Sequence, residues 1–158
     1  MLFVPLVDGR ILFEAMGSKT HPVGVTYSDV YDYLNCLKTS PCWGWMNTNS
    51  TVRDMTTQHA QALSAVYPQL VASQKYDSFT MHALTLDWRT IFAKWIAAGR
   101  DPAELIEPVD GFHPSTTGSQ LMAEEIWNEV QATAPDLLGP VNPNNAAIQA
   151  QFGAQGGY

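Results

Sequence analysis

Apolar residues gather in two short runs of the chain, and elsewhere they recur at helical spacing. The two runs are LFVPLV at residues 2–7, which the turn Asp8-Gly9-Arg10 follows, and FTMHALTL at residues 79–86, which polar residues bound. Runs of this length are too short to be helices of their own, so we predict two β-strands, the first of them buried. The first strand is interrupted or ended near Pro5 and leads into the turn Asp8-Gly9-Arg10.

Four stretches repeat apolar residues every three or four positions, as amphipathic helices do. The predicted helices span residues 27–37, 56–75, 88–98 and 115–134. Thr26, Asp87 and Ser115 can cap three of them, and Pro68 is expected to kink or break the second. The inward stripe of the last helix is predicted to consist of Ala123, Ile126, Trp127, Val130 and Ala134.

The alternation of strands and helices favours an α/β fold with parallel strands. Such a sheet normally has about five or six strands, whereas only two are convincing here. Either residues 11–15 form a further strand, or the chain is the C-terminal portion of a larger sheet whose first strands lie elsewhere, and we favour the second interpretation. Residues 1–138 are expected to belong to one domain and residues 139–158 to form an extended C-terminal tail.

The charge of the chain is unevenly placed. All eight Lys and Arg residues lie in residues 1–100, whereas residues 101–158 contain none and carry acidic residues. An acidic C-terminal third repels phosphate backbones, so no nucleic-acid partner is expected. No apolar run approaches the ~18 to 20 residues of a membrane-spanning helix, and the start lacks the pattern of a signal peptide.

Two cysteines and a glycosylation sequon lie close together in the first third of the chain. Cys36 and Cys42 are near enough to pair across a turn containing Pro41, and Asn49 opens the sequon Asn-Ser-Thr. The alternative is two reduced thiols and a chance sequon. We favour the disulfide, since neither a redox CxxC motif nor a metal cluster competes for the thiols. These features indicate a secreted, lysosomal or vesicular protein.

The stretch DGFHPSTTGSQLMAEEIW, at residues 110–127, carries the candidate chemistry. An imidazole can take a proton from a hydroxyl group, and a carboxylate bonded to its other nitrogen fixes the tautomer. Asp110 and His113 can meet that geometry on an irregular loop. Pro114 restricts His113 to an extended conformation, and Ser115 then caps the following helix.

This stretch resembles the closing block of the SGNH (GDSL-type) hydrolase superfamily. That block reads Asp-x-x-His, commonly Pro, and then a helix with small residues, which Gly118 and Ala123 supply here. The resemblance implies a three-layer α/β/α sandwich whose last two strands are residues 2–7 and 79–86. It also implies that His113 is the general base and Asp110 its orienting acid, acting on a serine nucleophile of ester hydrolysis.

Three further segments narrow the resemblance to one enzyme family. The segments VTYSDVYDYLNCLKTSPCWGWMN, LIEPVDGFHP and NPNNAAIQAQFGAQGGY are similar to the C-terminal part of a family that removes secondary fatty acyl chains from the lipid A of lipopolysaccharide. The implied substrate is an acylated glycolipid or another lipid ester. No cofactor is expected in this chain, and a calcium requirement of the full-length enzyme stays open.

The superfamily's other blocks are absent from the chain. There is no Gly-Asp-Ser nucleophile turn and no Gly-x-Asn-Asp block, and Gly17-Ser18 is only a distant approach to the first. We therefore expect a fragment that is inactive alone, its serine being supplied by a missing N-terminal part of the same protein or by a separate chain. The rival interpretation is a non-catalytic glycolipid-binding module or pseudoenzyme.

Trp43, Trp45 and Met46 form an apolar patch in the loop that follows the first helix. Such a patch could line a groove for an acyl chain, or the tryptophans could simply pack the loop onto the core. His21 could approach the cleft from the loop before that helix. No histidine has the partner spacing of a metal site, so no metal is expected.

Overall fold

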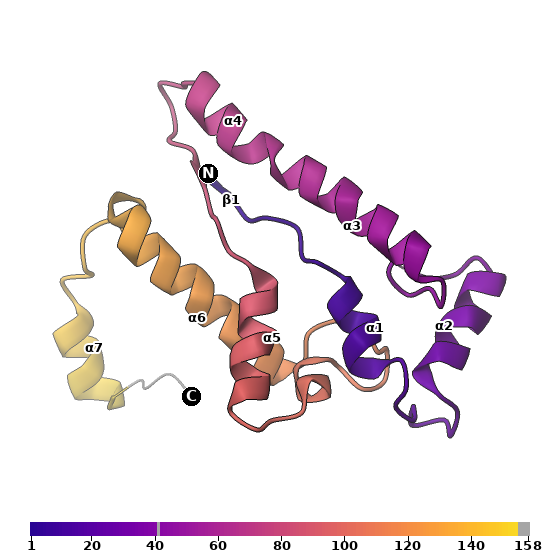
Figure 1. Cartoon of the computed structure of the whole chain (residues 1–158). Helices are drawn as coiled ribbons and strands as arrows, with labels where there is room; N and C mark the ends of the chain where they lie inside the picture. The colour runs from indigo at the N-terminus through magenta and orange to yellow at the C-terminus, as the bar shows by residue number, and fades with distance from the viewer. Residues whose placement is uncertain (41, 155–158) are drawn as a thin grey trace.

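The computed structural model describes residues 1–40 and 42–154 (Figure 1). In chain order, the elements are β1 (Leu2–Phe3), α1 (Arg10–Met16), α2 (Tyr27–Cys36), α3 (Ser50–Ser64), α4 (Val66–Ser73), β2 (His82–Ala83), α5 (Trp88–Ala97), the 3-10 helix η1 (Pro102–Leu105), α6 (Thr116–Thr133), the 3-10 helix η2 (Pro135–Leu138) and α7 (Asn145–Phe152). The predicted class, α/β with parallel strands, is confirmed, although helices make up most of the described chain.

Strands β1 and β2 pair in parallel, with Leu2 opposite His82 and Phe3 opposite Ala83. The pairing is shorter than the predicted strands because the backbone beyond Phe3 bonds to side chains instead. The carbonyl oxygen of Pro5 accepts a hydrogen bond from Trp88 Nε1 at 2.9 Å, and Leu6 N–H donates to Ser64 Oγ at 2.9 Å. Leu2 and Leu6 are exposed, so the predicted burial of the first strand is wrong for these positions.

Helices flank the two strands (Figure 1). On one side, Tyr67 of α4 stacks on Phe3 of β1, with 5.3 Å between the ring centroids. On the other side, α6 lies against the segment after β2, where Glu129 Oε1 accepts hydrogen bonds from the backbone N–H and hydroxyl of Thr85. The strands therefore lie between a layer containing α3 and α4 and a layer containing α5 and α6.

Residues 11–15, the alternative strand, belong to helix α1 instead. Ile11, Leu12, Ala15 and Met16 are all buried, and this spacing places them on one face of a helix. A strand would have pointed alternate residues to opposite faces. The shortage of strands noted in the sequence is therefore real in the described part of the chain.

The predicted helix at 56–75 is two helices with an earlier start. Asn49 caps α3 by accepting a hydrogen bond from Thr51 N–H, and the interruption falls at Ala65. Pro68 then lies in the first turn of α4. Backbone N–H groups in the first turn have no partner within the helix, so the missing N–H of proline costs no hydrogen bond there. The proline breaks the helix as predicted, and the break precedes it because the ring clashes with the preceding turn.

Helix α6 turns a different face inward from the one predicted. Val130 is buried and Ile126 packs against the core, but Ala123 is exposed and Trp127 is 53% exposed. Gly118 and Met122 take the inward positions, in line with Ile126. The predicted stripe is therefore right at Ile126 and Val130 and wrong at Ala123 and Trp127.

The last described segment is not extended throughout, as the sequence predicted. Helix α7 begins after Asn144 and ends at Phe152, and it is followed by Gly153, whose φ of +76° only glycine adopts readily. Its three alanines and two glutamines are good helix formers, which outweigh the Gly- and Pro-rich surroundings. Residues 155–158 of the predicted tail lie outside the described residues, and the boundary near residue 139 stays a prediction.

Cys36 and Cys42 are free thiols, so the predicted disulfide is wrong. Cys36 is exposed at the end of α2, whereas Cys42 packs against a core cluster that includes Met16, Tyr31 and Met46. The two side chains therefore lie in different environments. Burial raises the pKa of the Cys42 thiol, and Pro41, the residue expected at the turn between them, lies outside the described residues.

Candidate active site

A short loop between η1 and α6 carries Asp110 and His113. An isolated antiparallel bridge between Ile106 and Pro114 closes its base, and Glu107 N–H donates to the carbonyl of His113 at 2.9 Å. Glu107 Oε2 also accepts hydrogen bonds from two amides of the loop, those of Val109 and Asp110. The loop is therefore held together by hydrogen bonds between its own residues.

Asp110 and His113 form the predicted pair. His113 Nδ1 lies 2.6 Å from Asp110 Oδ2, while Asp110 Oδ1 accepts hydrogen bonds from the backbone N–H groups of Phe112 at 2.8 Å and His113 at 3.0 Å. Burial by itself would raise the pKa of Asp110, but these hydrogen bonds outweigh it, so the pKa lies below its usual value. An ionised carboxylate only accepts, so the proton in this hydrogen bond belongs to Nδ1 and leaves the Nε2 lone pair free.

The start of α6 fixes the position of the pair. Ser115 caps the helix by accepting a hydrogen bond from Gly118 N–H at 3.1 Å, and its hydroxyl donates to the carbonyl of Glu104 at 2.7 Å. A Cβ atom on Gly118 would lie 2.2 Å from the carbonyl oxygen of Leu105. The small residue that the family block has at this point is therefore required here by the close approach of η1 to α6.

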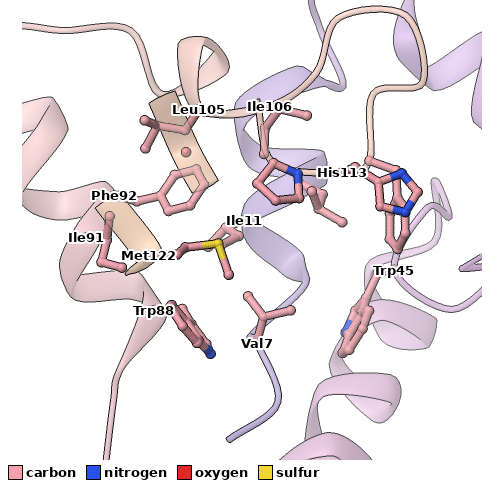
Figure 2. Close-up of a pocket in the computed structure, with 14 residues that line it drawn as sticks. Val7, Ile11, Trp45, Trp88, Ile91, Phe92, Leu105, Ile106, His113 and Met122 are labelled. Carbon is pink, nitrogen blue, oxygen red and sulfur yellow. The ribbon is translucent and has the colours of Figure 1, made fainter. Parts of the chain in front are cut away.

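An apolar cavity of about 180 Å³ opens beside His113 (Figure 2). Trp88, Ile91 and Phe92 of α5 form one side, and His113 and Trp45 lie on the other. The remaining lining residues are Val7, Ile11, Leu12, Leu105, Ile106, Phe112, Pro114, Gly118 and Met122. Apolar cavities of roughly 150 Å³ stay dry and admit a benzene-sized group, so this one suits a piece of hydrocarbon.

The three residues predicted to bind an acyl chain lie in different places. Trp45 lines the cavity and is fixed there by a 3.0 Å hydrogen bond from Nε1 to Thr57 Oγ1. Trp43 is 58% exposed and does not line this cavity. Met46 is fully buried in the core cluster, where it contacts α1 and α2 residues. Of the three, only Trp45 is brought next to His113.

Within residues 1–40 and 42–154, no serine hydroxyl is hydrogen-bonded to His113. Ser115, the nearest in sequence, is engaged at both its donor and its acceptor in capping α6. In the same residues, no three His, Cys, Asp or Glu side chains come together to hold a metal ion. His82 bonds to Thr133 Oγ1 at 3.1 Å, and His59 lies exposed on α3.

Three side chains behind the loop are only weakly indicated by the sequence. His21, Tyr27 and Tyr31 are buried, and each lies within hydrogen-bonding distance of a carbonyl oxygen of the loop. His21 therefore approaches the site, as the sequence suggested, but from the side away from the cavity. Two tyrosines four residues apart on α2, followed much later by Gly111, form the only pattern that could have revealed the contact.

The fold and the site together define a class of protein. A small parallel sheet flanked by helices, with an Asp–His pair on the loop before the last long helix of the domain, is consistent with part of an α/β hydrolase domain. In sequence, the chain is 39% identical to acyloxyacyl hydrolase of Homo sapiens, 40% to that of Oryctolagus cuniculus and 36% to that of Mus musculus. The chain is thus homologous to a part of acyloxyacyl hydrolase, and the predicted resemblance is confirmed.

The homology covers nearly all of this chain but a small part of each relative. Each alignment takes in 97% of this chain and 28% of the relative, so the chain spans about 28% of the length of these enzymes, consistent with a C-terminal part. No protein-family model matches the chain. Among the described residues, no helix is long and apolar enough to cross a membrane.

Proposed function

We propose that this chain supplies the base and the orienting acid of a carboxylic ester hydrolase of the SGNH type. The observation that carries the proposal is the 2.6 Å contact between His113 Nδ1 and Asp110 Oδ2, which leaves Nε2 free in a residue that lines an apolar cavity. Homology to enzymes named acyloxyacyl hydrolase supports an acyl ester as the bond that is cleaved. The proposed substrate is an acylated glycolipid such as the lipid A of lipopolysaccharide, from which secondary fatty acyl chains are released.

The proposed mechanism follows from the free Nε2 atom. Nε2 takes the proton of a serine hydroxyl while the serine oxygen bonds to the ester carbonyl carbon, and the carbonyl oxygen becomes an oxyanion. As the carbonyl re-forms, the carbon–oxygen bond of the ester breaks, and His113 returns the proton to the departing alcohol. Water then releases the fatty acid by the same two proton transfers. Asp110 stabilises the imidazolium formed in each step.

The serine in this proposal lies outside the chain. Its source is another part of a longer protein or a separate polypeptide, in keeping with relatives of which the chain spans only 28%. The chain alone is then inactive. A secretory, lysosomal or vesicular setting is part of the same proposal and draws support from the exposed sequon residue Asn49, whose Oδ1 is used as a helix cap.

The cavity is proposed as the place of the acyl chain next to the scissile bond. Trp45, rather than Trp43, is the wall residue within it. In the complete enzyme, Trp45→Ala should raise KM for long-chain esters more than for acetyl esters, because the long chain loses the larger apolar contact. Trp43→Ala is the matched control, since Trp43 is exposed and should leave both KM values unchanged.

Labelling with a fluorophosphonate probe tests the missing serine. The serine oxygen displaces fluoride from such a probe and forms a stable bond to phosphorus, which needs an active base. We expect the complete protein to be labelled and this chain alone to stay unlabelled. Labelling of this chain would overturn the assignment of the serine to another segment. A complete protein that binds acylated glycolipid but resists labelling would favour the non-catalytic module instead.

A further inference from the structure

Three buried side chains hold the Asp110–His113 loop from behind through its carbonyl oxygens. Tyr27 Oη–H donates to the carbonyl of Pro108 at 2.5 Å, and His21 Nε2 lies 2.8 Å from the carbonyl of Val109. Tyr31 Oη–H donates to the carbonyl of Gly111 at 2.6 Å. Among loop residues 108–111, every carbonyl oxygen except that of Asp110 is thus contacted by a side chain some eighty residues earlier in the sequence.

The directions of these donors are fixed by their own surroundings. Tyr27 and Tyr31 lie one helical turn apart on α2, so they present their rings on one face, with 6.1 Å between the centroids. The rings of His21 and Tyr27 pack edge to face, at a centroid distance of 5.0 Å. His21 Nδ1 accepts a hydrogen bond from Val23 N–H at 3.1 Å, so its proton is on Nε2, which donates to the loop.

Gly111 lets the loop lie directly on the two tyrosine rings. Its φ is +62°, and a Cβ atom there would be 2.7 Å from Tyr27 Cδ1 and 3.0 Å from Tyr31 Oη. A side chain would therefore have to push the loop away from α2. Gly111 lies between Asp110 and the residues Phe112 and His113, whose backbone N–H groups donate hydrogen bonds to Asp110 Oδ1. A shift of Gly111 would therefore also move the carboxylate relative to the imidazole.

The charged groups facing the tyrosines keep them as donors. Burial raises the pKa of Tyr27, and the carboxylates of Glu107 and Asp110 raise it further. Burial also raises the pKa of Tyr31, together with Tyr27 and Asp110. Both hydroxyl groups therefore remain protonated throughout the pH range in which an imidazole acts as a base, so their hydrogen bonds to the loop do not titrate there.

We propose that His21, Tyr27 and Tyr31 are positioning residues that fix the orientation of the Asp110–His113 pair through the loop backbone. None of the three lines the cavity beside His113, so they act on the pair and not on the substrate. The use of the pair in catalysis rests on the proposed function. The geometry of the pair does not, and it can be measured without any enzymatic activity.

The test measures the tautomer of His113 in the ¹⁵N-labelled chain at about pH 8, where an ordinary imidazole is neutral. Long-range ¹H–¹⁵N correlation spectra distinguish a proton on Nδ1 from one on Nε2. In the unaltered chain, the Nδ1–H form should exceed the other by about tenfold or more, because of its charge-assisted hydrogen bond. In Tyr27→Phe/Tyr31→Phe, which removes two hydroxyl groups and keeps the rings, that ratio should fall by at least about threefold.

The matched control is Tyr33→Phe, because Tyr33 is on the same helix and its side chain is exposed. It should leave the ratio unchanged. A double variant with a lowered melting temperature but an unchanged ratio below that temperature would show a merely structural role and overturn the proposal.

If the double variant does not fold, Tyr27→Phe alone and the pair His21→Gln and His21→Leu carry the same test. Gln keeps a side-chain donor that can reach Val109 and should preserve the ratio, whereas Leu removes it and should lower the ratio. If Tyr27→Phe and His21→Leu both kept the ratio of the unaltered chain, the proposal would be overturned.

Discussion

Asp110→Asn in the complete enzyme separates the orienting role of the carboxylate from its role in building the loop. The amide oxygen of Asn can still accept the backbone N–H groups of Phe112 and His113, which Asp110 Oδ1 accepts in the structure. Its NH₂ group then faces His113 Nδ1, where Oδ2 now lies at 2.6 Å. Two donors cannot bond to each other, so the imidazole places its proton on Nε2 and cannot accept one from a serine.

The size of the effect follows from the exposure of the pair. In a buried triad, replacing the carboxylate by an amide lowers kcat by about 10⁴. Here the side chain of Asp110 is 43% exposed and that of His113 is 65% exposed, and solvent weakens both the hydrogen bond and the attraction to the imidazolium. We therefore expect a loss of about 4 kcal/mol in transition-state stabilisation, or about 10³ in kcat.

The assay compares kcat and KM for an acyl ester between the complete enzyme and the Asp110→Asn variant. KM should change little, because Asp110 does not line the cavity beside His113. Asp136→Asn, an exposed position on η2, serves as the control and should match the unaltered enzyme. If Asp110→Asn keeps more than about a tenth of kcat with an unchanged melting temperature, Asp110 is not the orienting acid.

Three further predictions concern the framework of the site. Asp8, which is 10% exposed and bonded to Arg10 and Arg89, has a pKa lowered by these guanidinium groups despite burial. A carboxyl group with a lowered pKa contributes stability that is fully present above the unfolded value near 3.9 and decreases as the pH falls below it. Asp8→Asn should therefore lower the free energy of unfolding in urea by about 2 kcal/mol at pH 7 and by less at pH 3. An equal cost at both pH values would contradict this, and Asp136→Asn, at an exposed position on η2, is the control and should cost little at either pH. Gly118→Ala should lower the free energy of unfolding by about 2 kcal/mol or more, because its Cβ meets the Leu105 carbonyl at 2.2 Å, while Ser119→Ala should leave it unchanged; equal stabilities would refute the close approach. Under non-reducing conditions, a thiol reagent should label Cys36 quickly and Cys42 slowly. Labelling of both cysteines only after reduction would show that they form a disulfide.

Local chemistry along the chain was sufficient to predict much of the framework. The caps Thr26, Asp87 and Ser115 all accept the expected backbone N–H groups, because capping depends on a few neighbouring residues. The Asp110–His113 contact was also predicted, since both residues belong to one short loop. Pro114 and Ser115 fix where that loop ends, so little long-range information was needed.

Features that depend on distant packing were harder to predict. The face of α6 is set by its contact with η1 at Gly118, which the periodicity of α6 alone does not contain. The sequence places Met46 with Trp43 in an apolar patch of one loop, yet Met46 is buried because Asn35 Nδ2 bonds to its carbonyl and the core closes over its side chain. The support of the loop by Tyr31 joins residues eighty positions apart, and no local pattern encodes such a contact.

The role of His113 as the base is tested most directly by kcat of the complete enzyme carrying His113→Ala. Removing the base should lower kcat for an acyl ester by several orders of magnitude, about 10⁴ or more, with the melting temperature little changed because His113 is exposed. His59→Ala, an exposed histidine on α3, should keep full activity. If His113→Ala retained most of its activity, His113 would not be the general base, and this chain would not supply the catalytic Asp–His pair.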